Sequence, residues 1–205
     1  MVLARWPVPG RCKRRLAAGI GSGRAAGVQQ RLNRHTLASA LALRDLNSGA
    51  ITPELVLAAE PLGPRAAQRW ARLLGADRGV GQGSGGLGLR MQRQLQRAWR
   101  EGAEQVVLIG SDLPELQPGD LLVAFQALER APLVLGPAAD GGYWLIGLAR
   151  SAPTELAGRL CSGMPWGSVQ VLERTLAAAR ALVVEPALLE KRGDLDHAAD
   201  LRPWR

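Results

Sequence analysis

The segment from Gln105 to Leu116, with the sequence QVVLIGSDLPEL, constrains the fold of this chain most strongly. An apolar, β-branched run ends at Gly110-Ser111 and is followed by Asp112 and Pro114. This pattern is typical of a buried strand of a parallel sheet that ends in a turn. Ligands of open α/β sheets bind beyond the carboxyl ends of such strands, so Asp112 is a candidate site residue. The alternative is that Asp112 only caps the next helix.

The rest of the chain alternates between strand-like and helix-like segments. Apolar runs predict strands over residues 1–5, 54–59, 132–137, 144–148 and 182–185. Helical periodicity predicts helices over 24–46, 64–74, 89–101 and 119–130, one that ends at 180, and a short one over 197–201. Asn47-Ser48-Gly49 should end the first of these helices. Without an internal repeat or linker, we predict a single domain over 1–205, an α/β three-layer sandwich with a mostly parallel sheet.

Composition narrows the class of protein. The 205 residues are 47% hydrophobic, which is typical of a globular chain with a substantial core. No apolar run approaches the roughly 18 residues that span a bilayer, and the N-terminal apolar stretch is too short for a signal peptide. We therefore expect a cytoplasmic protein without a membrane span. Cys12 and Cys161 lack metal-ligand spacing and are expected to be reduced.

The net charge of +8 does not by itself indicate a nucleic-acid partner. Among the 26 basic residues, only Lys13 and Lys191 are lysines, and this bias towards arginine suggests genome composition as its origin. The cations are scattered, and a single Tyr and a single Phe leave little to stack on bases, so we expect no nucleic acid. A phosphate-bearing small molecule is the expected acidic partner. Because arginine is the usual cation of this chain, a lone lysine in a loop, such as Lys13, indicates that a compact point charge is needed there.

Two loops have the composition of phosphate-binding segments. Residues 6–16 (WPVPGRCKRRL) contain two prolines and a glycine and place four cations between positions 11 and 15. Free backbone N–H groups and clustered cations suit a di- or triphosphate, but a solvated basic turn is the alternative. The spacing of a Walker A loop is absent. Residues 82–88 (QGSGGLG) lead into a helix that carries Arg90 in its first turn, which suits an anion; a flexible loop is the alternative.

Further acids follow other predicted strands. Asp140-Gly141-Gly142-Tyr143 comes after the strand over 132–137, and Asp194 and Asp196 alternate before the C-terminal helix. Alternate residues of an extended segment point the same way, so these two acids could share a cation. The alternatives are a hairpin turn at 140–143 and a helix cap at Asp196. With Asp112 and the basic loop, these acids predict a site for Mg²⁺ and a nucleotide.

Taken together, these segments resemble a known family. The blocks PVPGRCKRRL, GGLGLRM, VLIGSDLPEL, LGPAADGGYWLIGL and DLDHAADL are spread over nearly the whole chain. In this order they resemble the bacterial radical-SAM/selenodomain-associated transferases, which are usually described as glycosyltransferases. That family is similar in fold to the nucleotide-diphospho-sugar transferases (GT-A) and to the guanylyltransferases that act on molybdenum cofactor and on phospholactate. The resemblance implies a GT-A-like fold for this chain.

The resemblance also implies roles for matching residues. Pro9, Gly10, Lys13 and Arg15 match the family pattern Pro-Gly-x-x-Lys-Thr-Arg, which would hold the nucleotide. We also expect the nucleotide to be bound by Arg5, at the end of the first predicted strand, and by Arg90, Gly110 and Ser111 of the matching segments.

Metal and acceptor roles follow in the same way. Asp112 matches the acid that binds the metal bridging the diphosphate, and Asp194 and Asp196 match a late Asp-x-Asp, so these three are the predicted metal ligands. The block 140–143 matches the one that faces the transferred group or acceptor. Within it the predicted catalytic residues are Asp140 and Tyr143, and the predicted acceptor-binding residues are Gly141 and Gly142.

We therefore expect a metal-dependent transferase, using Mg²⁺ or Mn²⁺, a nucleotide or nucleotide-sugar donor and a small-molecule acceptor, most similar to a glycosyltransferase. One alternative is a nucleotidyltransferase that releases pyrophosphate. Another is a non-catalytic nucleotide-binding protein, because the family block Gly-Asp-Leu-Gly-Glu-Arg-Met has lost its acids at Gly86 and Leu89, and the family Thr is Arg14. The base, the sugar, the acceptor and the oligomeric state, a homodimer included, stay open.

Overall fold

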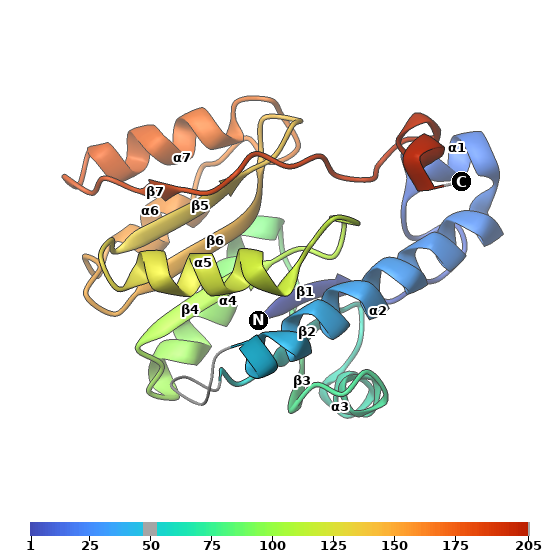
Figure 1. The fold of residues 1–205 in the computed structure, drawn as a ribbon, viewed down its shortest axis with the longest axis horizontal. Coiled ribbons are helices and arrows are strands. Elements are labelled where there is room, and N and C mark those ends of the chain that lie inside the picture. The colour runs from blue at the N-terminus through green and yellow to red at the C-terminus, as the bar shows by residue number, and fades with distance from the viewer. Residues whose placement is uncertain (47–52, 205) are drawn as a thin grey trace.

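The chain forms a seven-stranded sheet with helices on both faces (Figure 1). The structure is a computed structural model that describes residues 1–46 and 53–204. The strands are β1 (Val2–Arg5), β2 (Val56–Glu60), β3 (Arg78–Gly81), β4 (Gln105–Ile109), β5 (Leu133–Pro137), β6 (Tyr143–Ala149) and β7 (Ala187–Leu188). The helices are α1 (Arg14–Ile20), α2 (Ser22–Leu46), α3 (Pro64–Leu73), α4 (Leu87–Arg100), α5 (Pro118–Leu128), α6 (Leu156–Cys161), α7 (Val171–Arg180) and the 3₁₀ helix η1 (Ala198–Trp204). The predicted α/β three-layer sandwich is confirmed.

The strand order places the carboxyl ends of most strands at one edge of the sheet. The order is β3-β2-β1-β4-β6-β5-β7, and every pairing is parallel except those that β6 makes with β4 and β5. Because β6 runs the other way, its first residue, Tyr143, lies at the edge where its neighbours end. The sheet is thus mostly parallel, as predicted.

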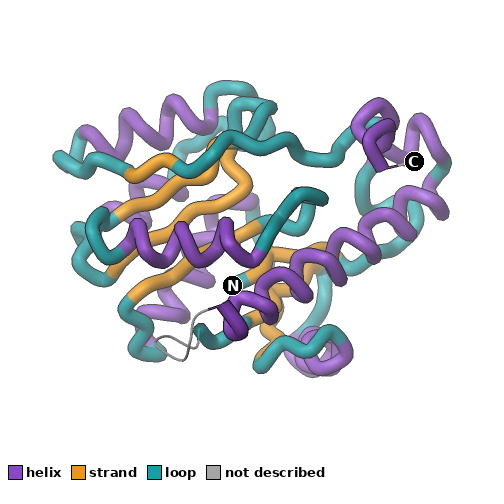
Figure 2. The backbone as a smooth tube through the Cα atoms, viewed as in Figure 1, coloured by secondary structure: helices purple, strands orange, loops and turns teal. Residues whose placement is uncertain are grey.

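The two helical layers cover opposite faces of the sheet because strand side chains alternate between those faces. In β4, Val107 and Ile109 pack into a core with apolar residues of α2, α3 and α5, whereas Val106 and Leu108 pack into a second core with α4, α6 and α7. Figure 2 shows the strands passing between these layers. A β-branched strand that is buried on both faces explains the unbroken apolar run in the sequence.

Polar side chains of α2 fix the ends of the two central strands. The Gln29 amide donates to Ser111 Oγ (3.2 Å) just after β4, and the Asn33 amide donates to the Arg5 carbonyl (3.0 Å) at the end of β1. Gln29 and Asn33 are one helical turn apart and buried, and they also bond to each other at 3.1 Å. A buried polar chain of this kind is stable only when its members are satisfied, so it specifies where these strands end.

Some local predictions were wrong. The chain forms a turn rather than a strand at 182–185, where Val183 adopts a positive φ of 57° and is 96% exposed; the strand that pairs with β5 is β7. Three elements, α1, β3 and α6, were not predicted, and the C-terminal helix is a 3₁₀ helix. The predicted helix end at 47–49 lies outside the described residues.

The C-terminal segment crosses the sheet edge after β7 and ends against α1 (Figure 1). There Leu195 is buried with Leu16, Val28 and Leu32 in a small third core. This crossing carries residues 189–196 back over the carboxyl ends of the strands. Across residues 1–46 and 53–204, no helix has the length and apolar character to cross a membrane.

Candidate functional site

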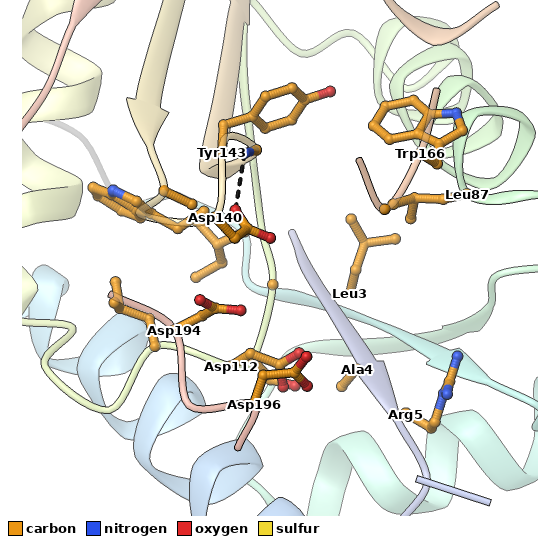
Figure 3. A pocket seen from close by; sticks show the side chains of 18 of the residues that line it. Leu3, Ala4, Arg5, Leu87, Asp112, Asp140, Tyr143, Trp166, Asp194 and Asp196 are labelled. Carbon is orange, nitrogen blue, oxygen red and sulfur yellow. Dashed lines mark hydrogen bonds between the residues drawn. The ribbon is translucent and has the colours of Figure 1, made fainter. Parts of the chain in front are cut away.

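A cavity of about 620 Å³ opens at the carboxyl edge of the sheet (Figure 3). Its volume lies within the roughly 300–1,000 Å³ typical of small-molecule sites. The fold brings most of the predicted site residues to its wall, although they come from distant parts of the chain. Those residues are Arg5, Lys13, Arg15, Arg90, Gly110, Ser111, Asp112, Asp140, Gly142, Tyr143, Asp194 and Asp196.

Three predicted residues do not line this cavity. Pro9 and Gly10 lie in an exposed turn before α1, so they shape the basic loop rather than contact a ligand in this conformation. Gly141 has a φ of +88°, and a Cβ on it would lie 2.2 Å from the Val169 carbonyl oxygen. Gly141 therefore has a packing role, because only glycine fits there.

Lys13 connects three segments of the site. Its ammonium forms an ion pair with Asp112 at 2.8 Å and donates to the Leu195 carbonyl. The Lys13 side chain is 2% exposed, whereas that of Asp112 is 52% exposed. Lys13 adopts a left-handed conformation (φ 46°, ψ 50°) at the N-cap of α1, an unusual geometry for a residue with a Cβ. The buried charge and the local backbone geometry together place the ammonium at the sheet edge.

Asp112 does not cap a helix. The next helix, α5, has Gln117 at its N-cap, and the Asp120 carboxylate accepts a hydrogen bond from the Gln117 N–H at 2.8 Å. The Asp112 carboxylate instead faces the cavity and Lys13, and the Asp112 carbonyl accepts a backbone bond from Leu195 (2.9 Å). The capping alternative for Asp112 is therefore wrong.

Asp196 forms a second ion pair across the same edge, with Arg15 at 2.6 Å. It does not cap η1, because the Asp200 carboxylate accepts the N–H groups of Asp196 (2.9 Å) and His197 (2.6 Å). The hydrogen bond to Asp196, followed by the charges of Asp196, Asp140 and Asp194, raises the pKa of Arg15. Arg15 therefore lies in the field of all three acids.

Of the five acids on the cavity wall, Asp140 and Asp194 have no ion-pair partner within 4 Å among the described residues. Asp140 Oδ1 accepts a hydrogen bond from the Gly142 N–H at 2.8 Å, which stabilises the predicted turn at 140–143. Asp140 and Gly142 also line the cavity, so this turn forms part of the cavity wall. Burial raises the pKa of Asp194, and the charges of Asp140 and Asp196 raise it further. These carboxylates therefore repel one another and would be stabilised by a cation.

The predicted metal set is not preassembled. Within residues 1–46 and 53–204, no three His, Cys, Asp or Glu side chains are grouped closely enough to hold a metal ion, and Asp112 and Asp196 are already paired with cations. Mg²⁺, however, is usually held by one or two carboxylates together with substrate phosphates. The carboxylates around Asp194 fit that arrangement, in which substrate phosphates would complete the set of ligands.

Tyr143 contributes its ring to the cavity wall. Its ring packs edge-to-face on Trp166, with the ring centres 6.2 Å apart. Its hydroxyl is buried without a hydrogen-bond partner among the described side chains, and burial raises its pKa. Figure 3 shows the ring pointing away from Asp194 and Asp196. A buried phenol with a raised pKa does not exchange protons readily at neutral pH, so these contacts favour a place for the Tyr143 ring in the cavity wall, and the catalytic role of Tyr143 stays a prediction.

Sequence reasoning missed the residues at the other end of the cavity. Glu60, at the end of β2, forms ion pairs with Arg5 (3.2 Å) and Arg90. The buried Gln82 follows β3, donates to the Ala4 and Ala58 carbonyls, and accepts from Arg90 at 3.4 Å. The strand-end rule that identified Asp112 could have found Glu60. It could not find Gln82, because β3 itself was not predicted.

The glycine-rich loop contributes by packing. A Cβ on Gly88 would lie 1.9 Å from the Cys161 carbonyl oxygen, so this glycine lets α4 approach α6 closely. Gly86 is the N-cap of α4, and the Leu89 side chain is 56% exposed. Neither Gly86 nor Leu89 lines the cavity. The two positions at which the family block has acids therefore lie outside the cavity wall.

Solved structures share this fold. A provisionally assigned nucleotide-diphospho-sugar transferase from Desulfovibrio desulfuricans G20 is 28% identical with a TM-score of 0.79, over 98% of this chain and 82% of that one. CMP:2-keto-3-deoxy-manno-octonic acid synthetase complexed with CTP is 12% identical with a TM-score of 0.59, over 99% and 94%. Glucosyl-3-phosphoglycerate synthase from Mycobacterium tuberculosis, in complex with Mn²⁺, UDP and glucosyl-3-phosphoglycerate, is 16% identical with a TM-score of 0.50, over 80% and 68%. The GT-A-like fold is thus confirmed.

Sequence comparison gives a family assignment. No curated protein is significantly similar in sequence to this chain. A family model described as an uncharacterized protein conserved in bacteria (DUF2064) matches residues 46–168, which include α3, β4, the 140–143 turn and Trp166. The fold is that of a transferase-like protein. Because the family model matches more than half of its length, the chain belongs to the DUF2064 family.

Proposed function

We propose that this protein is a metal-dependent transferase that takes a nucleotide or nucleotide-sugar donor and transfers a group, by glycosyl transfer, to a small-molecule hydroxyl. The observation that carries the proposal is the pairing of Lys13 with Asp112 beside two carboxylates, Asp140 and Asp194, that have no ion-pair partner in the part of the chain that the structure describes. These groups lie at the sheet edge where α/β folds bind ligands.

The charges of the wall support phosphate binding coupled to a metal. The wall carries five basic residues (Arg5, Lys13, Arg14, Arg15 and Arg90) and five acids (Glu60, Asp112, Asp140, Asp194 and Asp196). Because these charges balance, a diphosphate binds well only if it brings a cation or displaces carboxylates from the basic groups. Lys13 and Arg15 are placed to exchange their carboxylate partners for phosphate oxygens.

A divalent cation, Mg²⁺ or Mn²⁺, would be held by Asp194, joined by Asp112 and Asp196 as their basic partners turn to the phosphates. When bound it would neutralise diphosphate charge and so stabilise the leaving group. The protein's own contribution is positional: Lys13 and Arg15 orient the phosphates, and the crossing segment 189–196 brings Asp194 to them.

Asp140 is our candidate for the group that polarises the acceptor hydroxyl. The Gly142 N–H holds Asp140 Oδ1 at 2.8 Å, which fixes the carboxylate and leaves its other oxygen free to accept a proton or hydrogen bond. We expect Asp140→Asn to lower turnover by about 100-fold or more with little change in nucleotide affinity. Glu173→Gln, an exposed acid on α7, is the matched control. Full turnover in Asp140→Asn would remove Asp140 from this role.

The second candidate is a nucleotidyltransferase. It is favoured by the fold shared with CMP:2-keto-3-deoxy-manno-octonic acid synthetase, which was solved with CTP. The reaction products separate the two candidates: glycosyl transfer releases a nucleoside diphosphate, whereas nucleotidyl transfer attacks the α-phosphate and releases pyrophosphate. Incubation with nucleoside triphosphates and nucleotide-sugars in Mg²⁺ or Mn²⁺, followed by phosphate-product chromatography, tests this. Mg²⁺-dependent binding without either product for any acceptor would favour the non-catalytic alternative.

A further inference from the structure

One side of the cavity wall is apolar, although the other side carries the charged groups. This apolar wall consists of Leu3, Leu87, Met91, Tyr143, Ile146 and Trp166. Figure 3 shows Leu3, Leu87 and Trp166 on one side of the cavity and the labelled acids on the other. Asp140 lies between the two sides, since it immediately precedes the turn into Tyr143.

The apolar wall is the open end of the core beneath α4, α6 and α7. Met91 and Ile146 are buried members of that core, whereas Leu3, Tyr143 and Trp166 pack against it and stay partly exposed. Leu87, in the first turn of α4, is 39% exposed. Water against so many apolar side chains is unfavourable, and an apolar ligand group that displaces it is stabilised.

The wall is also held in place. Trp166 packs edge-to-face on Tyr143, and a Cβ on Gly88 would lie 2.9 Å from Trp166 Nε1, so the indole is fixed between the β6 edge and the start of α4. A preformed wall binds a rigid ligand group without a large ordering cost.

We propose that this wall binds the body of the acceptor, and that the acceptor is an alcohol carried on an apolar, ring-sized body rather than a sugar. This inference rests on the proposed function. A sugar can also lie on a tryptophan ring, but each of its hydroxyl groups then needs a hydrogen-bond partner. None of the six residues of the apolar wall offers a free polar group apart from Trp166 Nε1, because the Tyr143 hydroxyl is buried. An apolar body brings no polar group of its own that this wall would leave unpaired, while the hydroxyl that it carries reaches Asp140.

Leu87 and Leu89 provide a matched pair of variants for the test. Both are in the first turn of α4 and both are at least partly exposed, but only Leu87 lines the cavity. We expect Leu87→Asp to weaken binding of cyclohexylmethanol and benzyl alcohol by about tenfold or more, because it places a charge on the apolar wall. Leu89→Asp should leave that binding unchanged. Leu87→Ala, which adds no charge, should weaken it by a smaller factor and covers the case in which Leu87→Asp fails to fold.

Binding is measured by saturation-transfer NMR without nucleotide, so that the result does not depend on turnover. Glucose and glycerol are the polar comparison ligands, and the same four alcohols are then supplied as acceptors with the donor panel. Binding of the two apolar alcohols, sensitive to Leu87 and insensitive to Leu89, supports the inference even if no donor is turned over. Transfer to glucose or glycerol in preference to the apolar alcohols would overturn it and leave the proposed function standing. Equal binding of the apolar alcohols by the parent protein and both Leu87 variants would also overturn it.

Discussion

Removal of Asp112 should destabilise the protein more than removal of Lys13, although the two residues form a single ion pair. The reason is the difference in exposure, 2% for the Lys13 side chain and 52% for that of Asp112. Asp112→Ala leaves a buried ammonium whose remaining partner among the described residues is the Leu195 carbonyl. Loss of one partner from a buried pair costs about 3–5 kcal/mol, and we expect a value near the lower end because that carbonyl remains.

Lys13→Met should cost about 1 kcal/mol. It keeps the length of the aliphatic stem, and the carboxylate that it leaves behind is half-exposed and can be solvated by water. Its main costs are the lost charge pair and the unpaired Leu195 carbonyl. In the double variant no buried charge is left alone, so Lys13→Met should restore about 1–2 kcal/mol to the Asp112→Ala protein.

Equilibrium unfolding in urea measures these differences as changes in the free energy of unfolding at constant m-value. Lys191→Met is the control, because Lys191 is exposed and is the only other lysine; it should change stability by less than about 0.5 kcal/mol. A cost for Lys13→Met as large as that for Asp112→Ala would refute the difference in burial as the cause, and so would a double variant that is no more stable than Asp112→Ala alone.

Four further predictions follow from the site and its supports. Burial and then the charges of Asp140 and Asp196 raise the pKa of Asp194, so the ionisation of Asp194 opposes folding. Asp194→Asn should therefore raise Tm by about 2 °C or more at pH 7. Calorimetry across pH should show that this gain is absent below the ordinary pKa of 3.8, where Asp194 is protonated in the folded and unfolded chain alike. Gly141→Ala should destabilise by more than about 2 kcal/mol in urea, because it needs a φ of +88° and meets the Val169 carbonyl, whereas Gly23→Ala, in open space, should not. Gly86→Asp should stabilise by a few tenths of a kcal/mol through capping of α4, and an unchanged or lower Tm would contradict this. Burial raises the pKa of both thiols, that of Cys161 to about 12, so neither Cys12 nor Cys161 should react with a disulfide reagent until urea unfolds the chain.

Features with a local physical cause could be predicted from the sequence. The strand over 105–109 was recognisable because it is buried on both faces, and its apolar run ends sharply at Gly110. Since parallel strands share one carboxyl edge, the convergence of Asp112 and Asp140 also followed from the chain order. Strand β3 was missed because its sequence RGVG has little apolar character; its glycines are set by packing, and a Cβ on Gly79 would lie 2.1 Å from the Ala67 carbonyl oxygen.

The partners of the site residues could not be predicted, because they depend on contacts between segments far apart in the sequence. The loop composition indicated a reason for a lysine at position 13, but not that it is buried against Asp112 and Leu195. Tyr143 and Asp140 are near neighbours in sequence and were expected to act together. They diverge because β6 begins at Tyr143 and directs its ring to the core beneath α4 and α6, while the Asp140 turn stays at the edge.

The central claim is that the acids at this sheet edge bind a nucleotide together with a divalent cation. Titration calorimetry of nucleoside di- and triphosphates, with and without Mg²⁺ or Mn²⁺, tests it in the parent protein and in Asp194→Asn. Asp194→Asn is suitable because it should fold and be the more stable protein, so weaker binding would not reflect unfolding. We predict binding to the parent protein that depends on the cation and falls about tenfold or more in Asp194→Asn. Equal affinity in the two proteins, or binding that is indifferent to the cation, would contradict the account.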